Sequence, residues 1–543
     1  MNTVLFEKGL KWQSNTRYLG DKPEYHFYLD EAVFTTEPAY RAPSPACLDH
    51  LRVAFLLKDL TDVTFDFNGA RLVFHGRITP FILDNCQNVV LKNFLIDYDR
   101  PFYTQAEILD FTPGRLKMKI HDRFPYRMDG GYLVATSTTW ENYLNENNLL
   151  LQLYDRKTLT TAPFELILAL IGDEIHIPPY RLPLPIHHLH AARDGENVVL
   201  TGDFPQSWKS GYDLVITHEQ RDKNSFTALN CRDVLVENVR ILHGASVAFI
   251  GMHSENITLR HFDMFTDEKS AGLISNNADA VHTFNCLGQL RMESCRMESM
   301  LDDCLNVHGN FGEVTAVNGG AIRLDYGRSQ IGVSFGMVCP GETLAFCRGR
   351  TREEICERLV LAARAVGPYI MEVLLDGSAS GVAAGDVAEN LTAQAQTEVL
   401  DCDFGKYRGT MRLQTRAKTL VDRCRFYNDH LSILASGDVG TWWESSPLTD
   451  ACISNCEFCS AAGPQIKIAP EFEFTNQAPY YHRNIAVRDN LFHGSYAIDC
   501  SHADGLTFTG NRSAGGEELQ VRARHCGRMV LDNASLEKSD DAT

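Results

Sequence analysis

The sequence of 543 residues lacks an excess of positive charge, because it holds 51 Lys and Arg against 70 Asp and Glu, a formal net charge of −19. Such a chain repels phosphate backbones, and no local basic stripe offsets the repulsion, so we expect no nucleic-acid partner. The sequence also lacks a run of 18 or more apolar residues. It therefore predicts no membrane span and no membrane partner.

The first residues, MNTVLFEKGLKWQ, lack the charged region, apolar stretch and small-residue cleavage site of a secretory signal. The sequence as it stands therefore predicts a cytoplasmic protein, and a secreted or periplasmic one if a leader has been removed. The sixteen cysteines do not decide between these locations, because disulfide frameworks belong to short secreted chains.

A repeated strand pattern is the clearest positive signal. The pattern begins with alternating apolar residues and ends with a polar residue, a small or apolar residue and another apolar residue. It recurs in segments such as DVLVENVRI (233–241), TLVDRCRF (419–426) and IAVRDNLF (485–492). The base period is about 22 residues, with some coils enlarged by about ten. Equivalent positions are Val239, Phe262, Cys295, Cys402, Cys424, Cys456, Asn490 and Asn511.

Short strands at this period, without amphipathic helices between them, predict an all-β parallel β-helix solenoid. Stacked coils then bury the apolar face that no single coil can bury. Cysteine suits an inward ladder because it is a small, readily buried apolar residue. Cys452, Cys456 and Cys459 also offer three sulfurs that zinc could use, but the ladder makes packing the better explanation.

The repeat is interrupted twice by β-rich stretches, which predict small β-domains inserted into one solenoid. The expected division is an N-terminal part of the β-helix (1–98), a first insert (99–222), coils with the candidate catalytic residues (223–310), a second insert (311–396) and a C-terminal part of the β-helix (397–543). In the first insert, a histidine cluster formed by His187, His188 and His190 is more typical of a solvated loop than of a metal site.

Segment 351–364, TREEICERLVLAAR, predicts the one convincing helix. Its apolar residues Ile355, Leu359 and Leu361 follow a helical spacing, and it opens on a threonine followed by acidic residues, as a helix N-terminus prefers.

Acidic residues gather on one face of the predicted solenoid. Alignment of the coils places Asp279 opposite Asp303 and His282 opposite Asn306, while Asp302 adjoins Asp303. Carboxylates on neighbouring coils repel one another and raise at least one pKa, which a general acid working near neutral pH requires. Two carboxylates flanking a cleft are typical of glycoside hydrolysis. The alternative, that two of the three face solvent as turn residues, stays open.

These residues resemble a known family. NNADAVH (276–282) followed by LDDCLNVHG (301–309) looks like glycoside hydrolase family 110, the exo-acting α-galactosidases that remove terminal α-1,3-linked galactose. The resemblance implies a right-handed parallel β-helix with two inserted small β-barrel-like domains. It also implies an inverting mechanism without metal or cofactor, and an oligosaccharide or glycan with terminal α-galactose as substrate. The family's catalytic residues map onto Asp279, Asp302 and Asp303, with one aspartate of the pair as the acid and the others activating water. We assign Asp302 as the acid and Asp279 with Asp303 as the base.

Further residues on this face are candidates for substrate binding. Arg412 lies next to the coil of Asp303, with a surface ion pair as the alternative. In GTWWESS (440–446), Trp443 offers an apolar platform for a sugar ring, with core packing as the alternative. The full expected set is His282, Asn306, His308, Arg412, Trp443, Glu444 and Lys467.

Other functions stay open. The pectinases of glycoside hydrolase family 28 share the solenoid, and Asn277-Ala278-Asp279, Asp302-Asp303-Cys304 and Gln465-Ile466-Lys467 match their motifs in part. However, His308 follows the aspartate pair too closely for their G-H-G motif. A non-catalytic carbohydrate-binding β-helix is a second alternative, and a lyase or epimerase acting on acidic polysaccharides is a third. The oligomeric state, including a homo-oligomer, stays open.

Overall fold

A computed structural model of the chain describes residues 1–41, 50–144, 150–155, 160–161, 189–204, 210–218, 221, 223–266, 272–329, 332–333, 336–428, 430–437, 442–460, 462–472 and 480–538. His187 and His188 lie outside these residues. Within them, the helical content is a 3-10 turn, η1 (Pro38–Arg41), and we find no helix long and apolar enough to cross a membrane.

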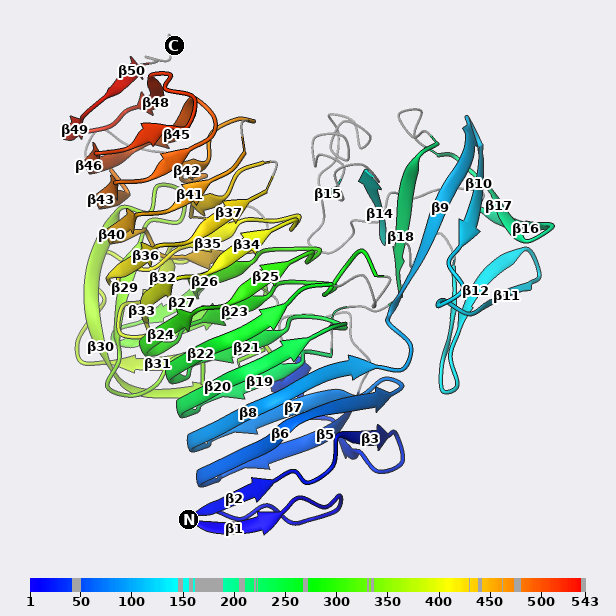
Figure 1. Cartoon of the computed structure of the whole chain (residues 1–543). Helices are drawn as coiled ribbons and strands as arrows, with labels where there is room; N and C mark the ends of the chain where they lie inside the picture. The colour runs from blue at the N-terminus through cyan, green and yellow to red at the C-terminus, as the bar shows by residue number, and fades with distance from the viewer. Residues whose placement is uncertain are drawn as a thin grey trace.

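The chain winds into a parallel β-helix whose coils stack from the N-terminus to the C-terminus (Figure 1). Its first long sheet contains β1 (Asn2–Leu5), β2 (Thr16–Leu19), β3 (Glu24–Tyr28), β6 (Thr61–His75), β8 (Gln87–Tyr98), β20 (Arg232–Ile241), β22 (Glu255–Met264), β24 (Leu287–Glu293), β25 (Arg296–Glu298), β33 (Gln396–Leu400), β34 (Asp403–Gly405), β36 (Thr419–Asp422), β37 (Arg425–Tyr427), β40 (Thr449–Ser454), β41 (Glu457–Phe458), β43 (His482–Arg488), β44 (Leu491–Phe492), β46 (Ala503–Thr509), β47 (Arg512–Ser513) and β49 (Met529–Leu531).

A second long sheet carries the other face of the coils and the candidate site. It contains β4 (Val33–Thr35), β5 (Leu51–Lys58), β7 (Thr79–Asp84), β19 (Phe226–Leu229), β21 (Phe249–Met252), β23 (Val281–Phe284), β26 (Leu305–Asn310), β35 (Met411–Leu413), β38 (Ile433–Ala435), β39 (Glu444–Ser445), β42 (Ile466–Ile468), β45 (Tyr496–Ser501), β48 (Leu519–Arg524) and β50 (Ala534–Lys538). The solenoid predicted from the repeat is confirmed.

Equivalent residues of successive coils form ladders inside the β-helix. Val239 pairs with Phe262, and the backbone N–H of Cys424 lies 3.4 Å from the sulfur of Cys456. The backbone N–H of Cys456 in turn donates to the side chain of Asn490. Cys456 is therefore part of the packed core, as the repeat predicted, and not a zinc ligand.

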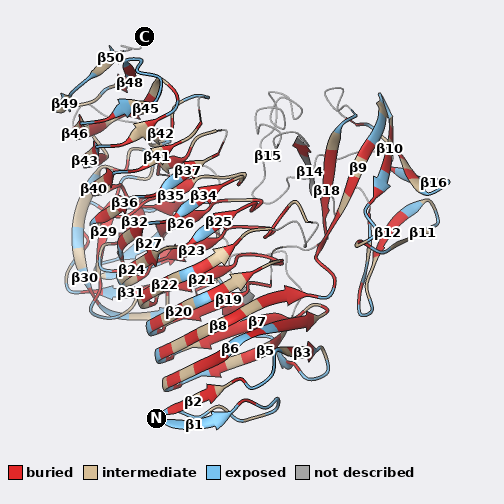
Figure 2. Cartoon of the chain, viewed as in Figure 1, coloured by how far each residue is buried: buried red, intermediate tan, exposed pale blue. Residues whose placement is uncertain are grey.

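Phenylalanine side chains on successive coils also form a ladder inside the β-helix. Phe404, Phe426, Phe458 and Phe492 follow one another on successive coils, with ring centroids 5.3, 5.0 and 4.8 Å apart. All four side chains are fully buried, and Figure 2 shows that buried residues recur in the strands of the stacked coils. Each such side chain contributes about 1.5–3 kcal/mol of hydrophobic stabilisation, so the stack supports the coils that carry the site.

The first insert leaves the β-helix after β8 and returns before β19. It forms an antiparallel sheet of β9 (Tyr103–Thr112), β10 (Arg115–Ile120), β14 (Leu150–Asp155), β15 (Thr160–Thr161), β16 (His190–Asp194), β17 (Asn197–Thr201) and β18 (Tyr212–Thr217), beside a small sheet of β11 (Tyr126–Asp129), β12 (Tyr132–Thr136) and β13 (Glu141–Tyr143). Over the described residues this sheet is open and not a closed barrel. Its core includes Leu301 of the β-helix, so the insert packs directly beside Asp302.

The second insert is a closed antiparallel barrel between β26 and β33. Its strands are β27 (Gly312–Asn318), β28 (Ala321–Asp325), β29 (Thr343–Cys347), β30 (Glu354–Ala365), β31 (Ile370–Leu375) and β32 (Val387–Asn390). The helix predicted over 351–364 is wrong, because most of that segment is β30. Hydrogen bonding to β29 on one side and β31 on the other closes the barrel and outweighs the local helix propensity of this segment.

Candidate active site

Three adjacent coils of the second sheet position the candidate catalytic residues. Asp279 lies just before β23 and Asp303 just before β26, and the next coil continues into β35. His282 pairs with Asn306, and Asn306 pairs with Arg412, so the register expected from the sequence is confirmed. The backbone N–H of Ala280 donates to the carbonyl of Asp303, which extends the pairing to the aspartates.

The carboxylates of Asp279, Asp302 and Asp303 converge, with one oxygen of each lying within 4.8 Å of the others. We call these three residues the aspartate triad. The side chains of Asp279 and Asp303 are each 10 % exposed and that of Asp302 is 23 % exposed. Asp302 is therefore the member that is most open to solvent.

Arginines surround the two adjacent aspartates. Oδ2 of Asp302 forms ion pairs with Arg221 and, at 3.1 Å, with Arg408. Oδ1 of Asp303 accepts hydrogen bonds from the backbone N–H and the hydroxyl of Thr410, and its Oδ2 lies 3.2 Å from Nε of Arg412. Fixed cations thus offset much of the repulsion within the triad.

The environment separates the pKa values of the triad. Burial acts to raise the pKa of Asp302, but Arg221 and Arg408 outweigh it and lower the pKa to about 2. Burial raises the pKa of Asp303 to about 7, against the opposing charge of Arg412 and with a contribution from Asp302. Burial and the charge of Asp302 also raise the pKa of Asp279. At neutral pH Asp302 is therefore a carboxylate, which disagrees with the proton that its expected role as the acid requires.

Two buried histidines connect to the triad. Nδ1 of His282 lies 2.8 Å from Oδ2 of Asp279, and its Nε2 lies 2.7 Å from Nε2 of His308. Burial opposes the charged form of His282, but Asp279 outweighs it, and the pKa of His282 is raised. Burial lowers the pKa of His308 to about 4. His308 is therefore neutral at pH 7, and the nearby carboxylate of Asp279 favours the charged form of His282.

Glu444 is buried against the same residues. Its carboxylate accepts hydrogen bonds from Asn306 at 3.1 Å and from Gln414 at 2.8 Å, and it lies 3.6 Å from Nε2 of His308. Burial acts to raise its pKa, but His308 and Arg412 reverse the effect and hold the pKa at about 2. The structure thus brings together five of the seven expected binding residues: His282, Asn306, His308, Arg412 and Glu444.

The other two expected binding residues, Lys467 and Trp443, are not part of this group. Lys467 pairs with Leu434, which belongs to the strand next to β35, so it shares the face of Arg412 two coils further on. Trp443 is 6 % exposed and packs with Phe311 and Val387. It is therefore not an open platform for a sugar ring, because the junction of the barrel and the β-helix covers it, whereas the neighbouring Trp442 is 39 % exposed.

Three residues that hold the aspartate pair, Arg221, Arg408 and Thr410, are not predicted from the sequence. Arg221 follows the first insert, and no pattern in the sequence indicates that it reaches Asp302. Arg408 and Thr410 stand one coil beyond the pair, so counting one further coil from Asp302 would have found them. Gly409 lies between them, and a Cβ atom at this position would lie 2.2 Å from Oδ1 of Asp303.

Among the described residues, four groups have the side chains and spacing to hold a metal ion. Two belong to the site: the aspartate triad, and His282 with His308 and Glu444. The other two lie elsewhere: His253 with Cys339 and Glu342, and Glu457 with Cys459 and His493. Arginines already neutralise the triad, so its charge balance does not need a cation.

Carboxylates that converge on one face, as these do on adjacent coils of the β-helix, are typical of glycoside hydrolases. The chain resembles the α-1,3-galactosidases of glycoside hydrolase family 110. It is 28 % identical over 544 aligned residues to alpha-1,3-galactosidase B of Bacteroides thetaiotaomicron, covering 95 % of this chain and 85 % of that protein. It is 25 % identical to alpha-1,3-galactosidase A of Bacteroides fragilis, covering 81 % and 71 %.

Comparisons with family models and with solved structures do not bear on the function of the chain. No family model matches the chain. Among solved structures, the A-module of mannuronan C-5 epimerase AlgE6 from Azotobacter vinelandii aligns over 97 % of this chain and 91 % of its own, but with 9 % identity and a TM-score of 0.27. That agreement is too low to bear on function.

Proposed function

We propose that this protein is an exo-acting α-galactosidase that removes terminal α-1,3-linked galactose from glycans. The observation that carries the proposal is the aspartate triad, in which buried carboxylates with separated pKa values converge beside fixed arginines. Pairs of titratable groups with pKa values pushed apart are typical of acid–base catalysis. The names of the similar proteins support galactose as the sugar and the α-1,3 bond as the linkage.

The proposed mechanism is an inverting hydrolysis without a metal. Asp279 and Asp303 activate a water molecule, and Asp302, the most open of the three, protonates the leaving oxygen. For this step the proton that Asp303 holds below about pH 7 moves to Asp302 as substrate separates Asp302 from Arg221 or Arg408, and this transfer leaves Asp303 ionised as the base. The inverting course is supported by the resemblance and not by the spacing, because carboxyl oxygens within 4.8 Å are closer than the ~6.5–9.5 Å typical of inverting pairs.

The test is a panel of terminal α- and β-galactosides in which NMR follows the anomer that is released first. We expect β-galactose from an α-1,3-linked substrate, no release from β-galactosides, and full activity after treatment with EDTA. Release of α-galactose would overturn inversion, and loss of activity that added metal restores would overturn the metal-independent mechanism. Binding of the glycan without turnover by the unaltered protein would overturn the enzymatic function.

A second candidate, a hydrolase acting on galacturonan, is supported by one observation. Arg221, Arg408 and Arg412 border the triad, and Lys467 shares the face of Arg412, so cations are present where a uronate carboxylate would bind. Each of the three arginines is already paired with an acidic side chain, which favours the neutral sugar. Polygalacturonate in the same panel distinguishes the two, because reducing ends released from it would support this candidate.

A further inference from the structure

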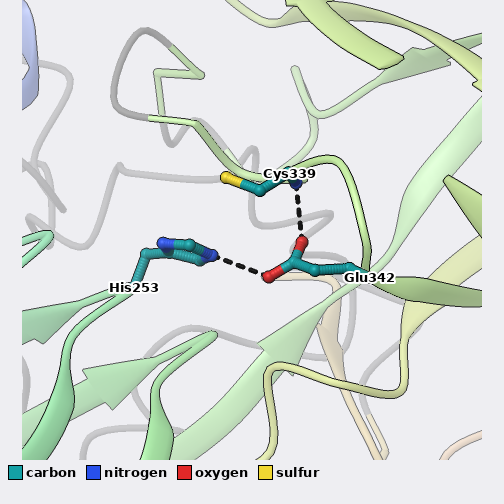
Figure 3. A group of neighbouring side chains, drawn as sticks. All are labelled: His253, Cys339 and Glu342. Atoms are coloured by element: carbon teal, nitrogen blue, oxygen red, sulfur yellow. Dashed lines mark hydrogen bonds and ion pairs between the residues drawn. The ribbon is translucent and has the colours of Figure 1, made fainter. Parts of the chain in front are cut away.

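A cluster outside the aspartate triad joins the second insert to the β-helix. His253 directly follows β21, whereas Cys339 and Glu342 precede β29 of the barrel. Nε2 of His253 lies 2.8 Å from Oε1 of Glu342, as Figure 3 shows. One nitrogen of His253, the sulfur of Cys339 and one oxygen of Glu342 all lie within 4.8 Å of one another. Three different donor atoms thus converge at the junction of the two parts.

The atoms of these side chains that face away from the cluster are already held. Nδ1 of His253 lies 3.2 Å from the side-chain oxygen of Asn230. Oε2 of Glu342 accepts hydrogen bonds from the backbone N–H of Cys339 at 2.6 Å and from Nδ2 of Asn390 at 2.8 Å. Metal-binding histidines and carboxylates commonly have such partners, which fix the tautomer and the orientation of the ligand.

The cluster is sheltered from solvent. The side chain of His253 is 13 % exposed and that of Glu342 is 6 % exposed, and Cys339 is half-buried. Its sulfur has a weak contact, at 3.7 Å, with the backbone oxygen of Gly336. A contact of this kind does not compete strongly with a metal ion for a thiolate.

We propose that Nε2 of His253, Sγ of Cys339 and Oε1 of Glu342 bind one zinc ion, which ties the second insert to the β-helix. A set of nitrogen, sulfur and carboxylate donors suits zinc, whereas calcium and magnesium prefer oxygen donors alone. Water completes the fourth position. Binding displaces two protons, one from the thiol of Cys339, which becomes a thiolate, and one from Nε2 of His253, which otherwise donates to Oε1 of Glu342, and both protons pass to solvent.

This site is independent of the proposed hydrolysis. Met252, the residue before His253, aligns with Phe284 and His308 on the two following coils, so the cluster lies beyond the ends of the strands that the aspartates precede. An ion bound here connects two parts of the fold and does not touch the triad. Its loss is expected to lower stability without removing activity.

The experiment uses the full chain, reduced and stripped of metal with EDTA. We expect native mass spectrometry to show one zinc per chain on titration, and cobalt in place of zinc to give the absorption of a cobalt–thiolate bond. Zinc is also expected to raise the melting temperature. Cys339→Ser is expected to weaken zinc binding at least a hundredfold and to abolish both the cobalt–thiolate absorption and the rise in melting temperature.

Two matched variants control for other cysteines. Cys356→Ser removes a half-buried thiol of the same barrel, and Cys459→Ser removes the thiol of the other His-Cys-Glu group. Both are expected to bind zinc as the unaltered chain does. The proposal is overturned if the chain binds no stoichiometric zinc, if Cys339→Ser binds it equally well, or if only Cys459→Ser loses it. Should Cys339→Ser not fold, His253→Gln takes its place in the same comparison.

Discussion

Nε2 of His282 lies 2.7 Å from Nε2 of His308, and Nδ1 of His308 lies 2.6 Å from the backbone oxygen of Gly309. A carbonyl oxygen only accepts hydrogen bonds, so neutral His308 donates from Nδ1 and accepts at Nε2. His282 must therefore donate from its own Nε2, which directs its Nδ1 toward Asp279. We infer from these contacts that His282 positions Asp279, as an alternative to the role in binding sugar that the sequence predicts.

Replacement of His282 is expected to act on kcat rather than on KM. In His282→Gln, Asp279 loses the imidazole that lies 2.8 Å from its carboxylate, so we expect kcat to fall about ten- to a hundredfold while KM changes less than about threefold. Steady-state kinetics on an α-1,3-galactoside measure both, and His493→Gln, an exposed histidine paired with Glu457, is the control. A raised KM with unchanged kcat would instead indicate a substrate ligand.

Periodicity alone was sufficient to predict how the site is stacked. Because residues of a parallel β-helix repeat at a nearly constant period, counting coils placed Asp279 next to Asp303 and His282 next to Asn306 without any knowledge of side-chain packing. The same count extended by one coil reaches Arg408. A prediction of this kind succeeds where backbone pairing determines position.

Packing between distant segments could not be predicted in this way. Arg221 reaches Asp302 only because the first insert folds back against the β-helix, and Trp443 is buried only because the barrel covers it. Segment 351–364 has the composition of a helix but becomes a strand when β29 and β31 pair with it. Each of these outcomes depends on a contact far away in the sequence, which local patterns do not record.

The acid of the aspartate pair can be identified from the leaving group of the substrate. An acidic leaving phenol departs without protonation, so a variant lacking the acid keeps more of its activity on a dinitrophenyl galactoside than on a disaccharide. We expect Asp302→Asn to lose about 10²–10⁴-fold in kcat on the disaccharide and much less on the activated substrate, whereas Asp303→Asn loses both activities alike. The opposite pattern would assign the role of acid to Asp303, whose pKa is the higher of the two.

The pH dependence follows from the raised pKa of Asp303, at about 7. The proposed reaction needs one proton on the aspartate pair, bound to Asp302 while Asp303 is ionised. The free site holds one proton, on Asp303, below about pH 7 and none above it. We therefore expect kcat/KM to stay level below about pH 7 and to decline above it, by about tenfold for each further pH unit, because the proton that Asp302 must donate is then lost. A decline below pH 7 instead would mean that the reacting form carries no proton on the pair, so that Asp302 is not the acid.

The same pKa has a consequence for stability. The pKa of Asp303 is raised above its ordinary value in the unfolded chain, so the folded state holds the proton more tightly, and ionisation of this group destabilises the fold as the pH rises through about 7. Asp303→Asn removes that charge. Thermal melting is expected to show the variant as more stable than the unaltered chain at pH 8, with the difference disappearing near pH 4. If the variant and the unaltered chain differ in melting temperature by the same amount at pH 8 and pH 4, titration of Asp303 is not the cause.

Gly409 is expected to be essential because a side chain does not fit at this position, and not because the backbone there needs the conformational freedom of glycine. A Cβ atom there would lie 2.2 Å from Oδ1 of Asp303 and 2.6 Å from its backbone nitrogen, so Gly409→Ala must displace the carboxylate. We expect kcat to fall at least a hundredfold, since small misplacements of a catalytic group are costly. Gly377→Ala is the control, because its Cβ would meet only a side-chain atom of Arg358 at 3.8 Å. Equal activity of both variants would show that Asp303 tolerates the shift.

The two adjacent tryptophans are expected to respond in opposite ways. Trp443 packs with Phe311 and Val387, and the guanidinium of Arg328 lies 4.6 Å from its ring centroid, so Trp443→Ala is expected to cost about 3–5 kcal/mol of stability. Trp442 is 39 % exposed beside β39, whose Glu444 belongs to the site. If Trp442 provides the sugar platform first expected of Trp443, Trp442→Ala raises KM severalfold and leaves kcat and the melting temperature unchanged. Thermal melting and steady-state kinetics of both variants test these expectations. A Trp443→Ala variant that is stable but has a raised KM would show that Trp443, and not Trp442, binds the sugar.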